Sequence, residues 1–149
     1  MPGALSHDLH KLTGRLDRVA DDLLRRHAEV SYSRFLTLFA VTQTGGSQRE
    51  LAQWLGLTEP STSRMVGVLA EQGLLTVARP AGAGNRRLLQ PTDDGARLVE
   101  RCGLLLEDRF TDLVDRSGVS YVAYQRDTRR LLARLETDQQ TALEPEGEA

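Results

Sequence analysis

Residues 47–75, SQRELAQWLGLTEPSTSRMVGVLAEQGLL, constrain the fold more than any other stretch of the chain. Ser47 with Glu50 three residues later is a capping-box pattern, in which the hydroxyl accepts from the backbone and the carboxylate reaches back, so it predicts the start of a helix. Gly56 stands where a left-handed residue commonly ends a helix. Thr58 then predicts the cap of a second helix. We therefore expect two short helices joined by a tight turn.

The second of these helices has two unlike faces. Its apolar face recurs at steps of three and four and is expected to point inward, with Thr62, Met65, Val66 and Leu69. Pro60 is tolerated in the first turn because no intrahelical donor is needed there. The residues left facing outward are small, polar or cationic, namely Ser61, Ser63, Arg64 and Gly67.

After residue 75 the pattern changes to that of a β-hairpin. Two short runs typical of strands, Leu75 to Arg79 and Arg86 to Gln90, flank a glycine-rich turn, and adjacent Arg86 and Arg87 are expected at its tip. Two helices, a tight turn and a basic hairpin predict a winged helix-turn-helix. The small first turn of the second helix would then enter a major groove, and the wing arginines the adjacent minor groove. The candidate DNA contacts are Thr58, Pro60, Ser61, Ser63, Arg64, Gly67, Arg86 and Arg87.

Helices are expected on both sides of this segment. The first carries an apolar stripe with coiled-coil spacing that needs a partner, formed by Leu5, Leu9, Leu12, Leu16, Val19 and Leu23. A second, largely buried helix contains Phe35 and Phe39. Thr92 predicts the cap of a long helix, and a last helix is expected from about Ser120.

Composition is that of a globular protein rather than a disordered or membrane one, with 40% hydrophobic and 27% charged residues in 149. The net charge of −2 does not by itself indicate nucleic acid. Between residues 47 and 90, however, five arginines stand against three glutamates, a local excess of two positive charges. The N-terminus lacks the pattern of a signal peptide, and the single cysteine agrees with a reducing compartment, so we expect a cytoplasmic protein that does not contact the membrane.

With these motifs in place, the chain resembles the MarR family of bacterial transcription regulators. The segment ELAQWLGLTEPSTSRMVGVLAEQGLL is similar to the family's helix-turn-helix core, and NRR followed by LLQPTDDG is similar to its wing and the junction to the next helix. The resemblance covers essentially the whole chain. It implies a mainly α fold with a small β-hairpin wing, in which a winged helix-turn-helix lobe is joined to N- and C-terminal dimerisation helices.

The resemblance also implies a function and its partners. We expect a homodimeric transcription regulator, most often a repressor, that binds double-stranded DNA at a pseudo-palindromic operator and responds to a small aromatic or phenolic effector. Candidate effector contacts are His10, Arg15, Tyr32, Phe35 and Phe39. The expected limits are a single domain over 1–140, with dimerisation helices at about 1–30 and 115–137, a lobe at about 32–95 and an acidic flexible tail at 138–149.

Other sites and functions have weaker support in the sequence. His7 and His10 lie three residues apart on one helix, but no cysteine or carboxylate stands at a matching spacing, so we expect neither a metal site nor a cofactor. Cys102 lies among apolar residues, which favours a buried, inert thiol over an oxidant sensor. Trp54 has the same two interpretations as Tyr32, Phe35 and Phe39: each is either a core residue or a ligand contact. No catalytic residues are expected, because no base lies near Cys102 and GAGNRR lacks the ending of a phosphate-binding loop. The alternative is a winged-helix domain used for protein contact, whose exposed face would be apolar or acidic.

Overall fold

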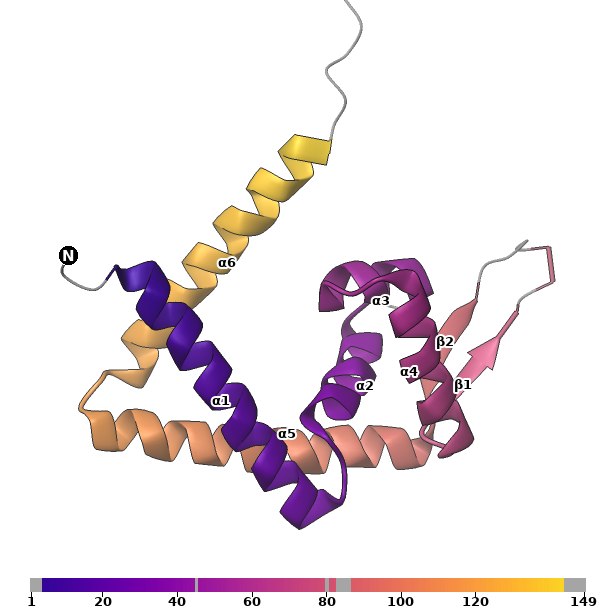
Figure 1. Ribbon diagram of the computed structural model, residues 1–149, viewed down its shortest axis with the longest axis horizontal. Coiled ribbons are helices and arrows are strands. Elements are labelled where there is room, and N and C mark those ends of the chain that lie inside the picture. The colour runs from indigo at the N-terminus through magenta and orange to yellow at the C-terminus, as the bar shows by residue number, and fades with distance from the viewer. Residues whose placement is uncertain (1–3, 45, 80, 83–86, 144–149) are drawn as a thin grey trace, which may run out of the picture. The chain divides into compact units, whose positions relative to one another are not determined.

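The computed structural model describes residues 4–44, 46–79, 81–82 and 87–143, and contains six helices and two strands in that part of the chain (Figure 1). In chain order these are α1 (Leu5–Ala28), α2 (Tyr32–Thr44), α3 (Gln48–Leu55), α4 (Glu59–Glu71), β1 (Leu75–Ala78), β2 (Leu88–Pro91), α5 (Asp93–Ser117) and α6 (Tyr121–Leu143). The mainly helical fold with a small β-hairpin that the sequence predicts is confirmed. None of the described helices combines the length and apolar character that a membrane crossing requires.

The chain packs as two compact units, Met1–Leu106 and Glu107–Ala149, whose boundary falls inside α5. In the first unit, α2 contacts α1, α3, α4 and β2, and α4 lies against β1 (Figure 1). In the second unit, the rings of Phe110 on α5 and Tyr124 on α6 lie 6.4 Å apart. The domain limits expected from the sequence remain a prediction.

The core of the first unit draws on all of its helices and both strands. The fully buried side chains include Leu24 of α1, Leu38 of α2, Leu51 of α3, Leu69 of α4, Leu89 of β2 and Cys102 of α5. Burying a leucine of this kind stabilises a fold by about 1.5 to 3 kcal/mol. The helix-turn-helix and the hairpin therefore share one core with the helices that flank them.

Side-chain caps start the helices at the residues that the sequence predicts. The Ser47 hydroxyl accepts from the Glu50 N–H at 3.1 Å, and the Thr58 hydroxyl accepts from the Ser61 N–H at 3.3 Å. Gly56 ends α3 in the left-handed region, at φ 64°. One half of the expected capping box is not formed within the described residues, because the Glu50 carboxylate makes no bond back to Ser47 there; it borders an open cleft instead.

The joint between α1 and α2 is also fixed by a side chain. The Asp21 carboxylate accepts from the Tyr32 N–H at 2.8 Å and from the Arg25 guanidinium at 2.6 Å. These two bonds, that with Arg25 first, hold the pKa of the Asp21 carboxyl below its ordinary value. Asp21 thus caps the first turn of α2 from the neighbouring helix.

The hairpin is shorter than the sequence predicts and begins later on its second strand. The antiparallel register pairs Leu75 with Pro91 and Ala78 with Leu88, so Arg79 and Arg87 follow and precede the paired residues instead of lying in strands. Pro91 takes the terminal position of β2, where a residue without an N–H is tolerated. Arg87 therefore lies at the base of the hairpin loop and not at its tip, while Arg86 lies outside the described residues.

Two backbone approaches fasten the hairpin to its neighbours. On one side the Leu89 N–H donates to the Gly46 carbonyl at 2.8 Å, with Gly46 at φ 97°. At the open end of the hairpin, the Thr92 N–H donates to the Leu74 carbonyl at 3.1 Å, and Gly95 of α5 lies so close that an added Cβ would be 2.0 Å from that carbonyl oxygen. The Thr92 hydroxyl caps α5 through the Gly95 N–H at 3.1 Å, as predicted.

We predict that Gly95→Ala lowers the free energy of unfolding by about 1 to 3 kcal/mol, because the new methyl group forces the Leu74 carbonyl away. Gly103→Ala, in the same helix, is the matched control, since an added Cβ there meets nothing within 4 Å. The control should be neutral or stabilising by up to about 1 kcal/mol, as for alanine in most helices. Urea unfolding at one fixed protein concentration measures both variants, and equal effects would contradict the close approach.

We also predict that the Cys102 thiol is unreactive in the folded protein. Its side chain is fully buried, and burial, opposed by the smaller effect of Arg101, raises the pKa of the thiol, which disfavours the nucleophilic thiolate. Labelling with an aromatic disulfide reagent should be at least about a hundredfold slower in buffer than in unfolding urea at the same pH. Similar rates in the two conditions would show that Cys102 is accessible.

Candidate nucleic-acid interface

The first turn of α4 is held by hydroxyl groups. Besides its bond to the Ser61 N–H, the Thr58 hydroxyl donates to the Ser61 hydroxyl at 3.0 Å, and the buried Thr62 hydroxyl donates to the Thr58 carbonyl at 3.0 Å. Pro60 occupies this turn, where its missing N–H leaves no intrahelical bond unmade. These residues fix the position of the turn, so Thr58 acts first as a cap.

The two faces of α4 are those predicted from the sequence, except that two serines of the outward face are less exposed than expected. Thr62, Val66 and Leu69 are buried and Met65 is half-buried. On the opposite face, Arg64 and Gly67 are exposed, whereas Ser61 and Ser63 are only partly so. An added Cβ at Gly67 would meet nothing within 4 Å, so another surface can approach closely there.

Arg64 is the cation of this exposed face. Its Nε donates to the Pro60 carbonyl one turn earlier, at 3.4 Å, and it forms no ion pair within the described residues. Because the remaining guanidinium donors have no partner among the described residues, they are available to a base edge or a phosphate. The small residues around Arg64 leave it the most prominent charged side chain on this face of α4.

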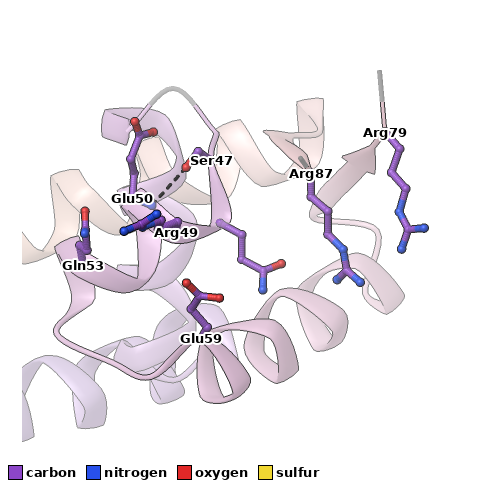
Figure 2. A pocket seen from close by; sticks show the side chains of 8 residues that line it. Ser47, Arg49, Glu50, Gln53, Glu59, Arg79 and Arg87 are labelled. Carbon is purple, nitrogen blue, oxygen red and sulfur yellow. Dashed lines mark hydrogen bonds between the residues drawn. The ribbon is translucent and has the colours of Figure 1, made fainter. Parts of the chain in front are cut away.

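An open cleft of about 790 Å³ lies between α3, the start of α4 and the hairpin (Figure 2). It is lined by Ser47, Gln48, Arg49, Glu50, Gln53, Glu59, Arg79 and Arg87. Figure 2 shows the two hairpin arginines projecting the same way from the strand ends, with the residues of α3 across the cleft and Glu59 at the start of α4. Every lining side chain is polar, so the cleft suits a charged, hydrated ligand.

The charged side chains of the cleft form no ion pairs with each other in the described part of the chain. Within the described residues, none of its three arginines and two glutamates takes part in an ion pair, whereas carboxylates elsewhere do, such as Asp21 with Arg25 at 2.6 Å and Asp112 with Arg116 at 2.9 Å. The cleft therefore carries a net charge of +1, from three arginines against two glutamates, and its guanidinium groups face solvent.

Sequence reasoning missed four charged residues of this cleft as site residues: Arg49, Glu50, Glu59 and Arg79. Arg79 could have been found only with the hairpin register, which places it across from Arg87 beside the last paired residues. Arg49 required knowing that the start of α3 reaches the second strand, where Ser47 bridges Leu88. Neither relation is local in the sequence.

The five candidate effector contacts are not brought together at this cleft, since none of them lines it. His10 and Arg15 are exposed on α1, and Phe35 is buried in the core. Tyr32, Phe35 and Phe39 form a row along α2 with ring centroids 6.2 and 6.0 Å apart. Phe35 is thus a core residue, and the effector site stays a prediction.

The aromatic row continues to the surface at Trp54 of α3, whose ring meets Phe39 edge-on at 6.1 Å and is 45% exposed. At its other end, burial and, to a smaller degree, Asp17 raise the pKa of the Tyr32 phenol above its ordinary value, which keeps the group protonated at neutral pH.

In the part of the chain that the structure describes, no three histidine, cysteine or acidic side chains are grouped as a metal ion would require.

Comparison with known proteins places this arrangement in a known class. Residues 33–78, which run from α2 through α3 and α4 to β1, match the IclR helix-turn-helix domain. No curated protein sequence matches the chain. The match to solved structures, in contrast, extends over nearly the whole chain.

Three of these structures illustrate the likeness. A cysteine-to-serine mutant of Escherichia coli MarR has a TM-score of 0.74 at 18% identity, over 91% of this chain and 98% of that one. MepR of Staphylococcus aureus, solved as a DNA complex, has a TM-score of 0.71 at 21% identity, over 91% and 98% of the two chains. PcaV of Streptomyces coelicolor, a transcriptional regulator solved with its natural ligand, has a TM-score of 0.66 at 23% identity, over 92% and 97%.

At these identities the likeness is one of fold, and it agrees with the resemblance seen in the sequence motifs. The helix-turn-helix of α3 and α4, the β1–β2 wing and the long helices on either side correspond to a single known architecture. The chain has the winged helix-turn-helix fold of the MarR-type transcription regulators.

Proposed function

We propose that the chain is a sequence-specific, DNA-binding transcription regulator that uses α4 as its recognition helix and β1–β2 as its wing. The observation that carries the proposal is the polar cleft between them, whose arginines are unpaired within the described residues. A protein-contact domain would instead present an apolar or acidic face there. Regulators with this fold include one solved on DNA, MepR, which supports the same partner for this chain.

In the proposed complex, different side chains contribute to affinity and to sequence specificity. Arg64, with the partly exposed Ser61 and Ser63, faces base edges and phosphates in the major groove. Arg87 and Arg79 at the base of the wing contact phosphates or the minor groove, as would Arg86. Thr58 and Pro60 set the helix start, and Gly67 allows close approach.

The active form is proposed to be a homodimer. The apolar stripe of α1 remains exposed in the single chain, with Leu5 71%, Leu9 38% and Leu12 37% accessible, and α6 likewise exposes Val122, Leu131, Leu132 and Leu135. A row of exposed apolar side chains along a helix is typical of a protein interface. A two-fold dimer presents two recognition helices, so its operator would be a pseudo-palindrome with half-sites about one helical turn apart.

DNA binding by this regulator is proposed to be controlled by a small effector. A repressor role and release by a small aromatic or phenolic effector follow from the resemblance, and the PcaV structure with its natural ligand supports an effector for this fold. Such control needs an effector that prefers the non-binding arrangement, with a coupling of about 1 to 3 kcal/mol. A regulator of this kind acts on DNA in the cytoplasm.

We predict different effects of two arginine substitutions on DNA binding. Arg64→Ala should weaken binding to the best sequence by about 1 to 3 kcal/mol and relax the sequence preference, because it removes a base contact. Arg87→Ala should weaken binding to all sequences and lower the slope of log affinity against log salt by about one, because it removes a phosphate contact. Fluorescence anisotropy at several salt concentrations, on duplexes selected from a random pool, measures both.

Arg101→Ala is the control for this experiment, because Arg101 is an exposed arginine of α5 that does not line the cleft. It should leave affinity, preference and salt slope unchanged. If neither cleft-side variant differed from wild type, the recognition-helix and wing assignments would both be wrong.

A second prediction concerns the dimer. Leu12→Glu should raise the dimer dissociation constant at least about tenfold, because it places a charge in the apolar stripe of α1. Lys11→Glu changes the neighbouring exposed residue outside the stripe and is the control. Analytical ultracentrifugation gives the association state of each variant, and a monomeric wild-type protein would contradict the proposed interface.

A further inference from the structure

Glu59 is the one acidic side chain at the start of the proposed recognition helix. It is the first residue of α4, it is exposed, and it borders the cleft opposite Arg79 and Arg87 of the wing (Figure 2). Residues at the N-terminal end of a helix that enters the major groove are those that reach base edges. A carboxylate therefore stands where the proposed function requires a contact with a base.

The Glu59 carboxylate is free to make such a contact. Within the described residues it forms neither an ion pair nor a hydrogen bond, although Arg79 and Arg87 line the same cleft. The start of α4 thus carries an acidic side chain that forms no ion pair or hydrogen bond within the described residues.

A carboxylate accepts hydrogen bonds and repels phosphates, so its choice of partners on DNA is narrow. In the major groove guanine presents two acceptors, and thymine an acceptor and a methyl group. Adenine offers its amino group only beside the N7 acceptor, which repels a carboxylate. Cytosine presents the N4 amino donor and is the matching base.

We propose that Glu59 is a specificity-determining residue that accepts a hydrogen bond from the N4 amino group of a cytosine in each half-site of the operator. The inference rests on the proposed DNA-binding function and deepens it. The unpaired arginines of the cleft supply attraction that is independent of sequence, and Glu59 weakens binding wherever no amino donor faces it. A negative charge within a basic cleft then serves discrimination between DNA sequences.

The test compares Glu59→Gln with Glu50→Gln. Both remove one negative charge from the same cleft, but Glu50 belongs to α3 and only Glu59 belongs to the recognition helix. Each full-length protein is used to select duplexes from a random pool. The wild-type site is then varied through all four bases at each position, and affinities are measured by anisotropy.

We expect the wild-type protein to prefer cytosine over adenine about tenfold at one position in each half-site. Glu59→Gln should reduce that ratio to about one or reverse it, because glutamine both donates and accepts and so matches adenine. Glu50→Gln should raise affinity for all sequences and leave the ratio unchanged. Glu59→Ala, a second variant, should abolish the preference without creating one for adenine.

The outcomes separate this inference from the proposed function. A wild-type protein that binds no sequence better than random duplex would overturn the proposed function, and the inference with it. A wild-type protein that selects a sequence, with the same base preference in Glu59→Gln and Glu59→Ala, would overturn the inference alone. Equal loss of preference in Glu50→Gln would show a general charge effect of the cleft, which also overturns it.

Discussion

The contact between the Gly46 and Leu89 backbones is the constraint on which the candidate interface depends. Gly46 adopts φ 97°, a conformation that other residues rarely take, and an added Cβ would lie 2.3 Å from the Leu89 carbonyl oxygen. Only glycine lets the chain leave α2, pair with β2 through the 2.8 Å bond from the Leu89 N–H, and turn at once into α3. That pairing is what brings Arg49 at the start of α3 and Arg87, just before β2, to the same cleft.

The open end of the hairpin is fixed by a similar close approach. The Leu74 carbonyl accepts from the Thr92 N–H, and α5 passes so near to it that position 95 has no room for a side chain. The β2 edge and the open end of this two-stranded sheet, which is marginal in isolation, are thereby held against the core. The positions of Arg79 and Arg87 are set by the backbone, and their exposed or half-exposed side chains add little to the packing. Substitution of these arginines should therefore affect binding without loss of the fold.

Local rules were enough to predict where the helices begin and end. Ser47, Thr58 and Thr92 act as caps and Gly56 is left-handed because each of these preferences depends on a few neighbouring residues. On the second strand the prediction was wrong in placing Arg87 inside the strand and in ending it at Gln90 instead of Pro91, since register depends on pairing that a glycine-rich turn does not specify. The cleft could not be predicted at all, because it joins residues from α3, α4 and the wing. Phe35, in contrast, was a candidate ligand contact from its type alone, and packing places it in the core.

A protein with net charge −2 can bind DNA if its charges are distributed as they are here. At physiological ionic strength the Debye length is about 8 Å, so acidic residues farther than that from the interface are largely screened. Several carboxylates that do not line the cleft are, in addition, paired with arginines of their own helices, such as Asp112 with Arg116. Counterion release on binding depends on the cations that reach phosphates, whatever the sum over the chain. In the proposed complex, the arginines of the cleft, unpaired within the described residues, supply the attraction to DNA, and Glu59 limits which sequences are accepted.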